Sequence, residues 1–431
     1  MAELLVLGGG PGGVAAAQTA ARLGARVTLV ERAALGGTCV HAGCIPAGAL
    51  HRTAAALDEV VRAERLGVRA TVTGVDWPCV QGWVGSVVSK AAGLTRAALH
   101  AAGVEVVGAA ARFTSPSRVE VDGRIFDGVP VVLATGAVSF APELAHPPTC
   151  SVLTNTEAMA IDRVPGRLLV TGGGRFSLEW ADLFAHLGSQ VTVATSEARV
   201  LPGEDSDIAG FLQLLLEHRG IAFHLGAAPD LAHLEPEAVL FADTRAPNTA
   251  GLGLDLAGVA VGTDGAVIVD AECRTTAEGV FAAGDVTGPP WLSNRARAMG
   301  IAAANCALGE TARFRPDRLP RSVNTHPELA AVGMTEEEAA GRGIDVAVGF
   351  GELSTSLRGI TLGEDQGALK LVVDPEFGEI LGAHMVGVGA SEVIAQVAAA
   401  MELEGDYRDL ARVHHLHPSL AELVTEAIAS I

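Results

Sequence analysis

Short apolar runs that lead into clusters of glycine recur along this chain and predict strands followed by tight turns. Residues 4–7 form such a run, and glycines in G-x-G-x-x-G spacing follow from Gly8 to Gly13. A helical pattern then extends to about Leu23, and the next apolar run ends at Glu31. This order of strand, glycine turn, helix and strand with a terminal acid predicts a dinucleotide-binding motif of the Rossmann type.

A second motif of the same kind begins at Arg167. The segment RLLVTGGG predicts a strand that runs into Gly172–Gly174, a helix follows to about Leu187, and QVTVA predicts the next strand. The third glycine position holds Ser177, and the strand ends in residues 194–196 without an acid for a ribose or arginines for a 2′-phosphate. The second motif is therefore predicted to be a degenerate copy of the first.

The hydrophobic pattern changes after about Arg321. The segment TEEEAAGRG predicts a helix that stops at glycine, and ALKLVVDPEFGEILGAHMVG predicts two antiparallel strands joined by a Pro/Gly turn. The segment SEVIAQVAAAMELEG predicts a helix with one apolar face. These elements indicate a separate antiparallel α+β domain. Before them, GVFAAGDVTG predicts a strand and a tight turn with Asp285 at the strand end.

The composition narrows the class of protein. The chain has 431 residues, of which 49% are hydrophobic and 52 are glycine, as suits an α/β protein with many tight turns. A net charge of −20 makes nucleic acids and anionic membranes improbable partners. Apolar stretches stay shorter than the roughly 18 residues that span a bilayer. The N-terminus lacks a basic region and predicts a strand rather than a signal peptide, so a cytoplasmic location is expected.

The six cysteines are too few for a secreted disulfide framework. Cys39 and Cys44 lie close together in GGTCVHAGCIP, and if this segment is helical their sulfurs lie about one turn apart on one face. That geometry permits a reversible disulfide, and a helix N-terminus would lower a thiol pKa. The alternative is a pair of buried structural cysteines. The other four are expected to be buried packing residues: Cys79, Cys150, Cys273 and Cys306.

The segment HHLHPSLAE near the end of the chain contains a candidate acid–base pair, His417 and Glu422. A carboxylate bonded to one ring nitrogen would raise the basicity of the imidazole, and the other nitrogen could then take a proton from a thiol. The rival interpretation is metal binding by His417 together with the neighbouring His414 and His415. Because no ligand set with metal spacing accompanies them, no metal site is predicted.

Together these motifs resemble the class I flavoprotein disulfide reductases, the pyridine nucleotide-disulfide oxidoreductase family, and dihydrolipoamide dehydrogenase most among its members. The resemblance rests on GGGPGG, GGTCVHAGCIP, VLATG at 132–136, TGGGRFSLE, GVFAAGDVTG and HLHPSLAE, and covers nearly the whole chain. It implies an α/β fold with two Rossmann-like dinucleotide-binding domains and a C-terminal α+β dimerisation domain. The implied boundaries are 1–149 and 267–316 for an FAD domain, 150–266 for a truncated NAD(P)-type domain, and 317–431 for the dimerisation domain.

The resemblance also implies roles for single residues. Cys44 would exchange electrons with the flavin and Cys39 would meet the substrate. His417 and Glu422 of one subunit would complete the active site of the other in a homodimer, which favours a dithiol or disulfide substrate over a metal ion. The residues implied at FAD are Gly8, Gly10, Pro11, Gly12, Gly13, Glu31, Arg32, Gly37, Thr38, Ala134, Thr135, Gly136, Gly284 and Asp285. Those implied on the nicotinamide side are Gly172, Gly174, Arg175 and Glu179.

Departures from the family pattern gather on the NAD(P)H side. The lysine that usually follows the second cysteine is replaced in Pro46-Ala47-Gly48, so Glu179 is expected to lack its cation. Only about a dozen residues separate 226 from 239, too few for the usual β-meander, and FADTR replaces ATGR. Further departures are His41 between the cysteines, Arg175 at an aromatic position, Ser177 at the third glycine and Thr195 at the ribose acid.

Three functions are compatible with this pattern. The first is an FAD-dependent oxidase or dehydrogenase of a small or carrier-bound dithiol, with oxygen, a quinone or a partner protein collecting the electrons in place of NAD(P)+. The second is an NAD(P)-linked reductase like dihydrolipoamide dehydrogenase, in which Arg175 and Arg199 hold the phosphates. The third is an inactive scaffold paralogue, which the retained cysteines and His-Glu pair disfavour.

Overall fold

The computed structural model describes residues 2–143, 150–227 and 234–431. The chain divides into two compact units. Unit 1 comprises residues 1–142, 154–163 and 244–315, and unit 2 comprises residues 143–153, 164–243 and 316–431. No helix in the described part of the chain is both long and apolar enough to cross a membrane.

A five-stranded parallel sheet forms the centre of unit 1, with strand order β15-β7-β1-β2-β3. Its strands are β1 (Glu3–Leu7), β2 (Arg26–Val30), β3 (Glu105–Val107), β7 (Val131–Leu133) and β15 (Val280–Ala282). Helix α1 (Pro11–Arg22) follows the first glycine turn and packs against α10 (Ser293–Ala307). The predicted strand–turn–helix–strand motif at the N-terminus is confirmed.

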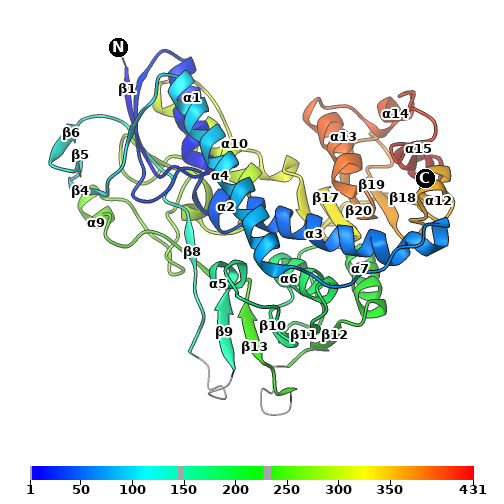
Figure 1. Ribbon diagram of the computed structural model, residues 1–431. Coiled ribbons are helices and arrows are strands. Elements are labelled where there is room, and N and C mark those ends of the chain that lie inside the picture. Colours follow the sequence, from blue (N-terminus) through cyan, green and yellow to red (C-terminus); the bar gives the residue numbers. More distant parts are fainter. Residues whose placement is uncertain (1, 144–149, 228–233) are drawn as a thin grey trace. The chain divides into compact units, whose positions relative to one another are not determined.

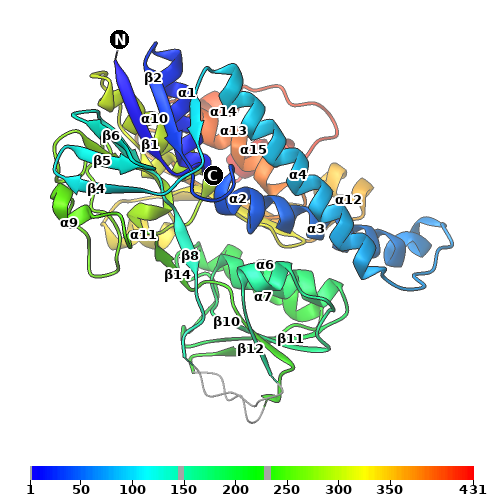
Figure 2. The ribbon, with the colours of Figure 1, turned by 60° about the vertical axis from the view of Figure 1, so that its left-hand side comes forward.

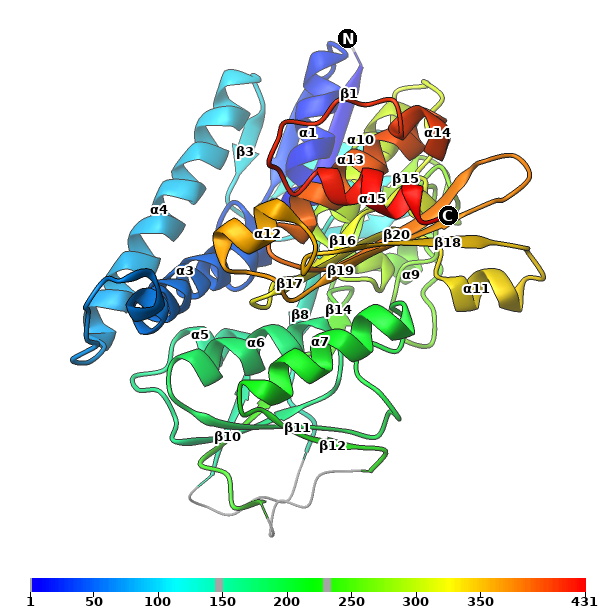
Figure 3. The same cartoon turned by 90° about the vertical axis from the view of Figure 1, so that its right-hand side faces the viewer.

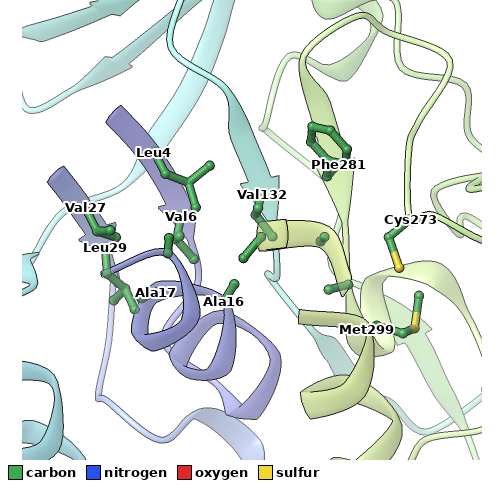
Figure 4. Packing of buried hydrophobic residues seen from close by; sticks show 14 of the residues in the cluster. Leu4, Val6, Ala16, Ala17, Val27, Leu29, Val132, Cys273, Phe281 and Met299 are labelled. Carbon is green, nitrogen blue, oxygen red and sulfur yellow. The ribbon is translucent and has the colours of Figure 1, made fainter. Parts of the chain in front are cut away.

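Alternate residues of β1 belong to two different cores. Leu4 and Val6 pack with residues of α1 and α10 on one face of the sheet (Figure 4). Leu5 and Leu7 pack on the other face, in a cluster that includes Phe113. A parallel sheet that is covered on both faces needs continuous apolar strands, which explains the uninterrupted run at residues 4–7.

Unit 1 contains further helices and two small sheets. Helices α3 (Cys44–Arg62) and α4 (Trp77–Ala101) lie side by side (Figure 1). An antiparallel sheet contains β4, β5 and β6, and β8 pairs with β14. Their bounds are β4 (Ala111–Ser115), β5 (Arg118–Val121), β6 (Arg124–Asp127), β8 (Ala137–Ser139) and β14 (Arg245–Pro247), and the short helices are α2 (Gly37–His41), η1 (Ala63–Leu66), α5 (Asn155–Met159), α9 (Leu254–Ala257) and η2 (Gly284–Thr287).

The first part of unit 2 is built on a sheet with strand order β12-β11-β10-β13-β9. Its strands are β9 (Ser151–Thr154), β10 (Arg167–Thr171), β11 (Gln190–Thr195), β12 (Ala222–Leu225) and β13 (Ala238–Phe241). Helices α6 (Arg175–His186) and α7 (Ser206–His218) lie on one face of this sheet (Figure 2). The second Rossmann-like motif is thus present, and the short segment between β12 and β13 includes residues 228–233, which lie outside the described residues.

The second part of unit 2 is an antiparallel sheet with order β16-β17-β20-β19-β18. Helices α13 and α15 cover one face and α7 packs on the other (Figure 3). The predicted α+β domain, with its two antiparallel strands and its helices, is confirmed. The elements are η3 (Pro316–Arg318), β16 (Arg321–Val323), β17 (Glu328–Gly333), α11 (Glu336–Gly341), β18 (Ala347–Glu352), α12 (Leu357–Leu362), β19 (Ala368–Val373), β20 (Ile380–Gly387), α13 (Ala390–Glu402), α14 (Tyr407–Leu410) and α15 (Glu422–Ala429).

Candidate functional site

The two close cysteines lie on two helices rather than on one. Cys39 lies in α2 and Cys44 is the first residue of α3, with a break at Ala42 and Gly43. The condition of a single helix, under which the sulfurs would lie one turn apart, is therefore not met. Gly43 allows the break, because a Cβ at this position would meet the carbonyl oxygen of Thr38 at 2.9 Å. The break turns the chain back so that the Cys39 and Cys44 side chains hydrogen-bond to each other.

The electrostatics of this pair favour the protonated thiol at Cys39. The hydrogen bond with Cys44, burial and the negative charge of Asp285 raise the pKa of Cys39, and a hydrogen bond from Ser293 opposes the rise. The predicted lowering of a thiol pKa is therefore wrong for Cys39, which lies in a five-residue helix. Ser293, the first residue of α10, also has its Oγ atom 3.2 Å from the Sγ atom of Cys44.

The other cysteines differ from one another in exposure. Cys150, Cys273 and Cys306 are buried, as predicted. Burial raises the pKa of Cys273 to about 12, which makes this thiol unreactive at neutral pH. Cys79 is exposed in the first turn of α4, so its predicted burial is wrong.

The N-terminus of α1 forms an open cradle for a phosphate. Gly13 permits the tight turn, because a Cβ at this position would meet the Gly8 carbonyl oxygen at 1.8 Å. Pro11 occupies the first turn of α1, and Gly12 faces α10, where a Cβ would lie 3.1 Å from the Ala296 carbonyl oxygen. The residue that caps this helix is Gly10, which has no side chain to cover the helix end. Within the described residues, the first turn of α1 contains no acidic residue either. The residues therefore fit the pyrophosphate of a dinucleotide.

The acid at the end of β2 is tied to the same turn. The Gly9 amide donates to Glu31 Oε2 at 2.7 Å, and the Ala33 amide donates to Glu31 Oε1 at 2.8 Å. These bonds hold the carboxylate beside the glycine turn, where the Rossmann arrangement places a ribose. Arg32 is exposed next to it. Gly37 and Thr38 lie in the first turn of α2, and a Cβ at Gly37 would lie 2.9 Å from the Gly10 Cα atom.

Two further segments of unit 1 carry the remaining residues expected at FAD. Ala134, Thr135 and Gly136 follow β7, and the Thr135 hydroxyl donates to the Asn248 carbonyl oxygen at 2.8 Å. Gly284 and Asp285 form the start of η2, and Asp285 Oδ2 lies 3.6 Å from Arg245 Nη2.

The residues expected on the nicotinamide side are held by contacts within unit 2. Gly172 and Gly174 form the turn before α6, and the Arg175 guanidinium lies over the Phe176 ring at 4.7 Å. Glu179 Oε1 accepts hydrogen bonds from the Asn324 backbone amide at 2.9 Å and side-chain amide at 3.1 Å. The amide of Asn324 is therefore one partner of the carboxylate whose usual cation is missing from the sequence.

Arg199 has a structural role in the loop after β11. Its guanidinium donates at 2.8 Å to each of the carbonyl oxygens of Leu201, Pro202 and Glu204. A guanidinium committed to three carbonyls is poorly placed to hold a phosphate, so the proposed phosphate role of Arg199 loses support.

The predicted acid–base pair is formed near the C-terminus. His417 Nδ1 lies 2.9 Å from Glu422 Oε1, and the Ser419 amide donates to Glu422 Oε2 at 2.8 Å. The hydrogen bond from His417 and that from Ser419 lower the pKa of Glu422. The side chain of His417 is 65% exposed. Within the described residues, no group of three or more His, Cys, Asp or Glu side chains could hold a metal ion.

Two residues near these sites were not identified from the sequence. Ser293 lies 249 positions from Cys44 and belongs to no motif that marks it. Asp243 follows β13, and its carboxylate accepts hydrogen bonds from the Gly174 amide in the turn before α6 and from the Ser177 hydroxyl in α6. The replacement of ATGR by FADTR was visible in the sequence, but the contacts of this aspartate were not.

Comparison with known proteins agrees with this geometry. Residues 2–310 match the pyridine nucleotide-disulphide oxidoreductase family, and residues 319–428 match its dimerisation domain. The chain is 36% identical over 454 residues to dihydrolipoyl dehydrogenase 2 of Haloarcula marismortui, with 99% of this chain and 96% of that protein covered. It is 36% identical over 450 residues to dihydrolipoyl dehydrogenase of Thermus scotoductus, with 100% and 97% covered.

Solved structures show the same fold. LpdA from Mycobacterium tuberculosis superposes with a TM-score of 0.91 at 28% identity, covering 100% of this chain and 99% of that one. The HOCl-induced flavoprotein disulfide reductase RclA from Escherichia coli superposes with a TM-score of 0.86 at 29% identity, covering 99% of each chain. The chain is therefore a flavin-dependent oxidoreductase that acts on sulfur groups, and it belongs to the pyridine nucleotide-disulphide oxidoreductase family.

Proposed function

We propose that this protein oxidises a dithiol substrate through a disulfide between Cys39 and Cys44 and passes the electron pair to bound FAD. In the exchange, a substrate thiolate attacks one sulfur of the disulfide and forms a mixed disulfide. The second substrate thiol then displaces the enzyme sulfur, which leaves an oxidised substrate disulfide and two cysteine thiols. The names of the curated relatives favour a dihydrolipoyl group as the dithiol.

The hydrogen bond between the Cys39 and Cys44 side chains carries this proposal. Two thiols in hydrogen-bond contact are close enough in the fold for a disulfide to form between them. Cys44 is exposed and Cys39 is partly buried. The Ser293 hydroxyl beside Cys44 can stabilise a thiolate by donating its proton.

FAD supplies the two-electron acceptor when it is bound. The N-terminus of α1 and the glycine turn from Gly8 to Gly13 would hold its pyrophosphate, and Glu31 would face its ribose. Asp285, at the start of η2, would hold the flavin side of the same cofactor. These residues fit the group because the helix end is open and glycine permits close approach of the backbone.

His417 would take the proton from the substrate thiol, and Glu422 would hold its imidazole in the required tautomer. The match of residues 319–428 to a dimerisation domain supports a homodimer in which this pair serves the cysteines of the second copy. A cytoplasmic location and the boundaries of the three domains stay predictions.

The electron acceptor has two candidates. The family is named for a pyridine nucleotide, and the relatives are dihydrolipoyl dehydrogenases. Both observations favour NAD(P)+ as the electron acceptor. The contacts of Asp243 at the turn before α6 favour an acceptor other than NAD(P)+. The dithiol half of the reaction is the same for both candidates.

Anaerobic titration of the purified yellow protein with dihydrolipoamide tests the dithiol half of the reaction. We expect bleaching of the flavin absorbance in the wild type and its loss in Cys39→Ser and Cys44→Ser. Cys79→Ser removes an exposed thiol from α4 and is the matched control that keeps bleaching. A colourless protein, or a flavin that no dithiol reduces, would contradict the proposal and favour the scaffold interpretation.

A further inference from the structure

The two Rossmann-like motifs of this chain can be compared residue by residue, because the strand registers define equivalent positions. In unit 1, Leu7 pairs with Leu133 just before the glycine turn. In unit 2, Thr171 pairs with Phe241 at the same place. Counting from these pairs, Gly10 is equivalent to Gly174, Gly13 to Ser177 and Thr135 to Asp243.

The phosphate cradle of unit 1 is open. For a Cβ built on Gly10, the nearest described atom is the Cα of Gly37 at 4.0 Å. The hydroxyl of Thr135 is committed to the Asn248 carbonyl oxygen, to which it donates at 2.8 Å. A pyrophosphate can therefore reach the backbone amides at the start of α1.

The equivalent cradle of unit 2 is filled by the carboxylate of Asp243. A Cβ built on Gly174 would meet Asp243 Oδ2 at 2.6 Å, and one built on Gly172 would meet it at 2.7 Å. The Gly174 amide donates to Asp243 Oδ2 at 2.8 Å, and the Ser177 amide approaches Oδ1 at 3.4 Å. The amides that would bind a phosphate are already bound to an anion of the protein itself.

Ser177 completes this arrangement. Its Oγ atom lies 2.7 Å from Asp243 Oδ2 and 2.9 Å from the Thr171 carbonyl oxygen. The hydroxyl that replaces the third glycine is thus a partner of the carboxylate that follows β13. Burial raises the pKa of Asp243, and the hydrogen bonds from Ser177, Gly174 and Phe176 oppose the rise. Two separate departures from the family sequence form one structural feature.

We propose that Asp243 is a built-in substitute for the dinucleotide pyrophosphate, which prevents NADH and NADPH from binding to unit 2. The carboxyl group of Asp243 occupies the amides at the start of α6, so a pyrophosphate would have to displace it. NAD(P) therefore does not fit the residues present in this motif. This inference rests on the proposed function in one respect, the transfer of the electron pair to bound FAD. It concerns the next step, namely which compound then collects the electrons from the flavin.

The other anchors of the second motif agree with this assignment. Thr195 stands at the position of the ribose acid, and its Oγ atom accepts the Glu197 amide at 3.2 Å. A Cβ built on Gly173 would lie 3.1 Å from Thr195 Cγ2, so this side chain packs on the glycine turn. With Arg199 bound to three carbonyl oxygens, the motif offers no replacement cation from that loop.

Isothermal titration of the FAD-saturated protein with NADH, NADPH and ADP-ribose, each up to about 1 mM, tests the proposal. We expect no saturable binding to the wild type. Asp243→Thr installs the residue found at the equivalent position of unit 1 and should bind ADP-ribose at least tenfold more tightly than the wild type. Asp243→Asn removes the charge but keeps an acceptor for the Gly174 amide. It is the second variant to be measured if Asp243→Thr does not fold.

Glu217→Gln is the control for net charge. Glu217 is exposed near the C-terminal end of α7, at the edge of the sheet opposite the cradle, where it accepts the Gln213 side-chain amide at 2.8 Å. Its substitution should leave ADP-ribose binding as weak as in the wild type. Saturable micromolar binding of NADH or NADPH by the wild type would overturn the proposal, as would equally weak binding by both Asp243 variants. Failure of dithiols to bleach the flavin would instead count against the proposed function and would leave the titration interpretable.

Discussion

The Nδ1 atom of His417 lies 2.9 Å from the Oε1 atom of Glu422, and this bond fixes one ring nitrogen of an exposed imidazole. Glu422 is held in turn by the Ser419 amide, at the start of α15. The carboxylate is therefore positioned before any substrate arrives. A base that is already oriented does not pay for its alignment during the reaction.

Glu422→Gln should slow flavin reduction by a dithiol about tenfold or more near neutral pH, because an amide neither stabilises the imidazolium nor holds the tautomer as well. The measurement is anaerobic stopped-flow at several pH values. The slow rate should recover as pH rises and the substrate thiol ionises without a base. His414→Gln changes another exposed histidine of the same segment and leaves the His417–Glu422 bond in place, so it should keep the wild-type rate. An unchanged pH profile in Glu422→Gln would assign the pair a purely structural role.

Ser293→Ala should raise the pKa of Cys39 further, because the hydrogen bond from Ser293 is the contact that lowers it. The rate of alkylation of the reduced protein by iodoacetamide at a fixed alkaline pH, followed by mass spectrometry, tests this effect. Cys39 should be alkylated more slowly in the variant than in the wild type, and Cys79 in the same sample serves as an internal control. An unchanged rate for Cys39 would show that Ser293 does not act on the thiol pair.

Lys370→Met should destabilise unit 2 by about 3–5 kcal/mol, because it leaves the buried carboxylate of Asp205 without a counter-charge. Lys370 is 1% exposed, and its Nζ atom lies 2.9 Å from Asp205, which is 0% exposed, and 2.7 Å from Asp207 and Glu336. Urea unfolding at neutral pH measures the loss. Lys90→Met, at an exposed position of α4, should change stability by less than about 0.5 kcal/mol.

The same lysine sets a pH dependence at the alkaline end. Burial lowers the pKa of Lys370, but hydrogen bonds to Asp207, Glu336 and Asp205 outweigh burial and raise that pKa above its usual range. Since the folded protein holds the proton more tightly, the stabilisation is fully present below the unfolded pKa of about 10.4 and is lost as pH rises through the folded pKa. The stability difference between wild type and Lys370→Met should therefore be constant from pH 7 to 9 and shrink above it. A difference that grows with pH would contradict this linkage.

Gly300→Ala should weaken the contact between α1 and α10, because a Cβ at this position would meet the Gly12 carbonyl oxygen at 2.1 Å. Overpacking of this kind costs about 1–3 kcal/mol. Since Gly12 belongs to the turn expected at FAD, the variant should also release flavin more readily, as measured by fluorescence after mild heating. Gly93→Ala in α4, where a Cβ meets nothing within 4 Å of the described atoms, should instead stabilise by up to about 1 kcal/mol.

Local patterns predicted much of the fold. The strands β10 and β11 and the antiparallel pair β19 and β20 follow from apolar periodicity and glycine turns, which act over a few neighbouring residues. Glu422 at the start of α15 and its bond to His417 were likewise predictable, because only five positions separate them.

Contacts between distant residues were not predictable in this way. The one-turn separation of Cys39 and Cys44 was expected only if their segment was one helix, and the structure breaks that helix at Gly43, where a Cβ would meet the Thr38 carbonyl oxygen. Cys79 was expected to be buried but is exposed. Residue type alone does not say which face of α4 a cysteine occupies.

The sequence by itself determined the order of strands and helices, the family, and the presence of a cysteine pair and a His-Glu pair, since each depends on residue types at short spacing. The tertiary structure alone decided that Ser293 reaches Cys44 across 249 positions and that Asp243 reaches Ser177 across 66. Such contacts depend on the register of strands and on where their ends meet, and no local pattern along the chain records that register.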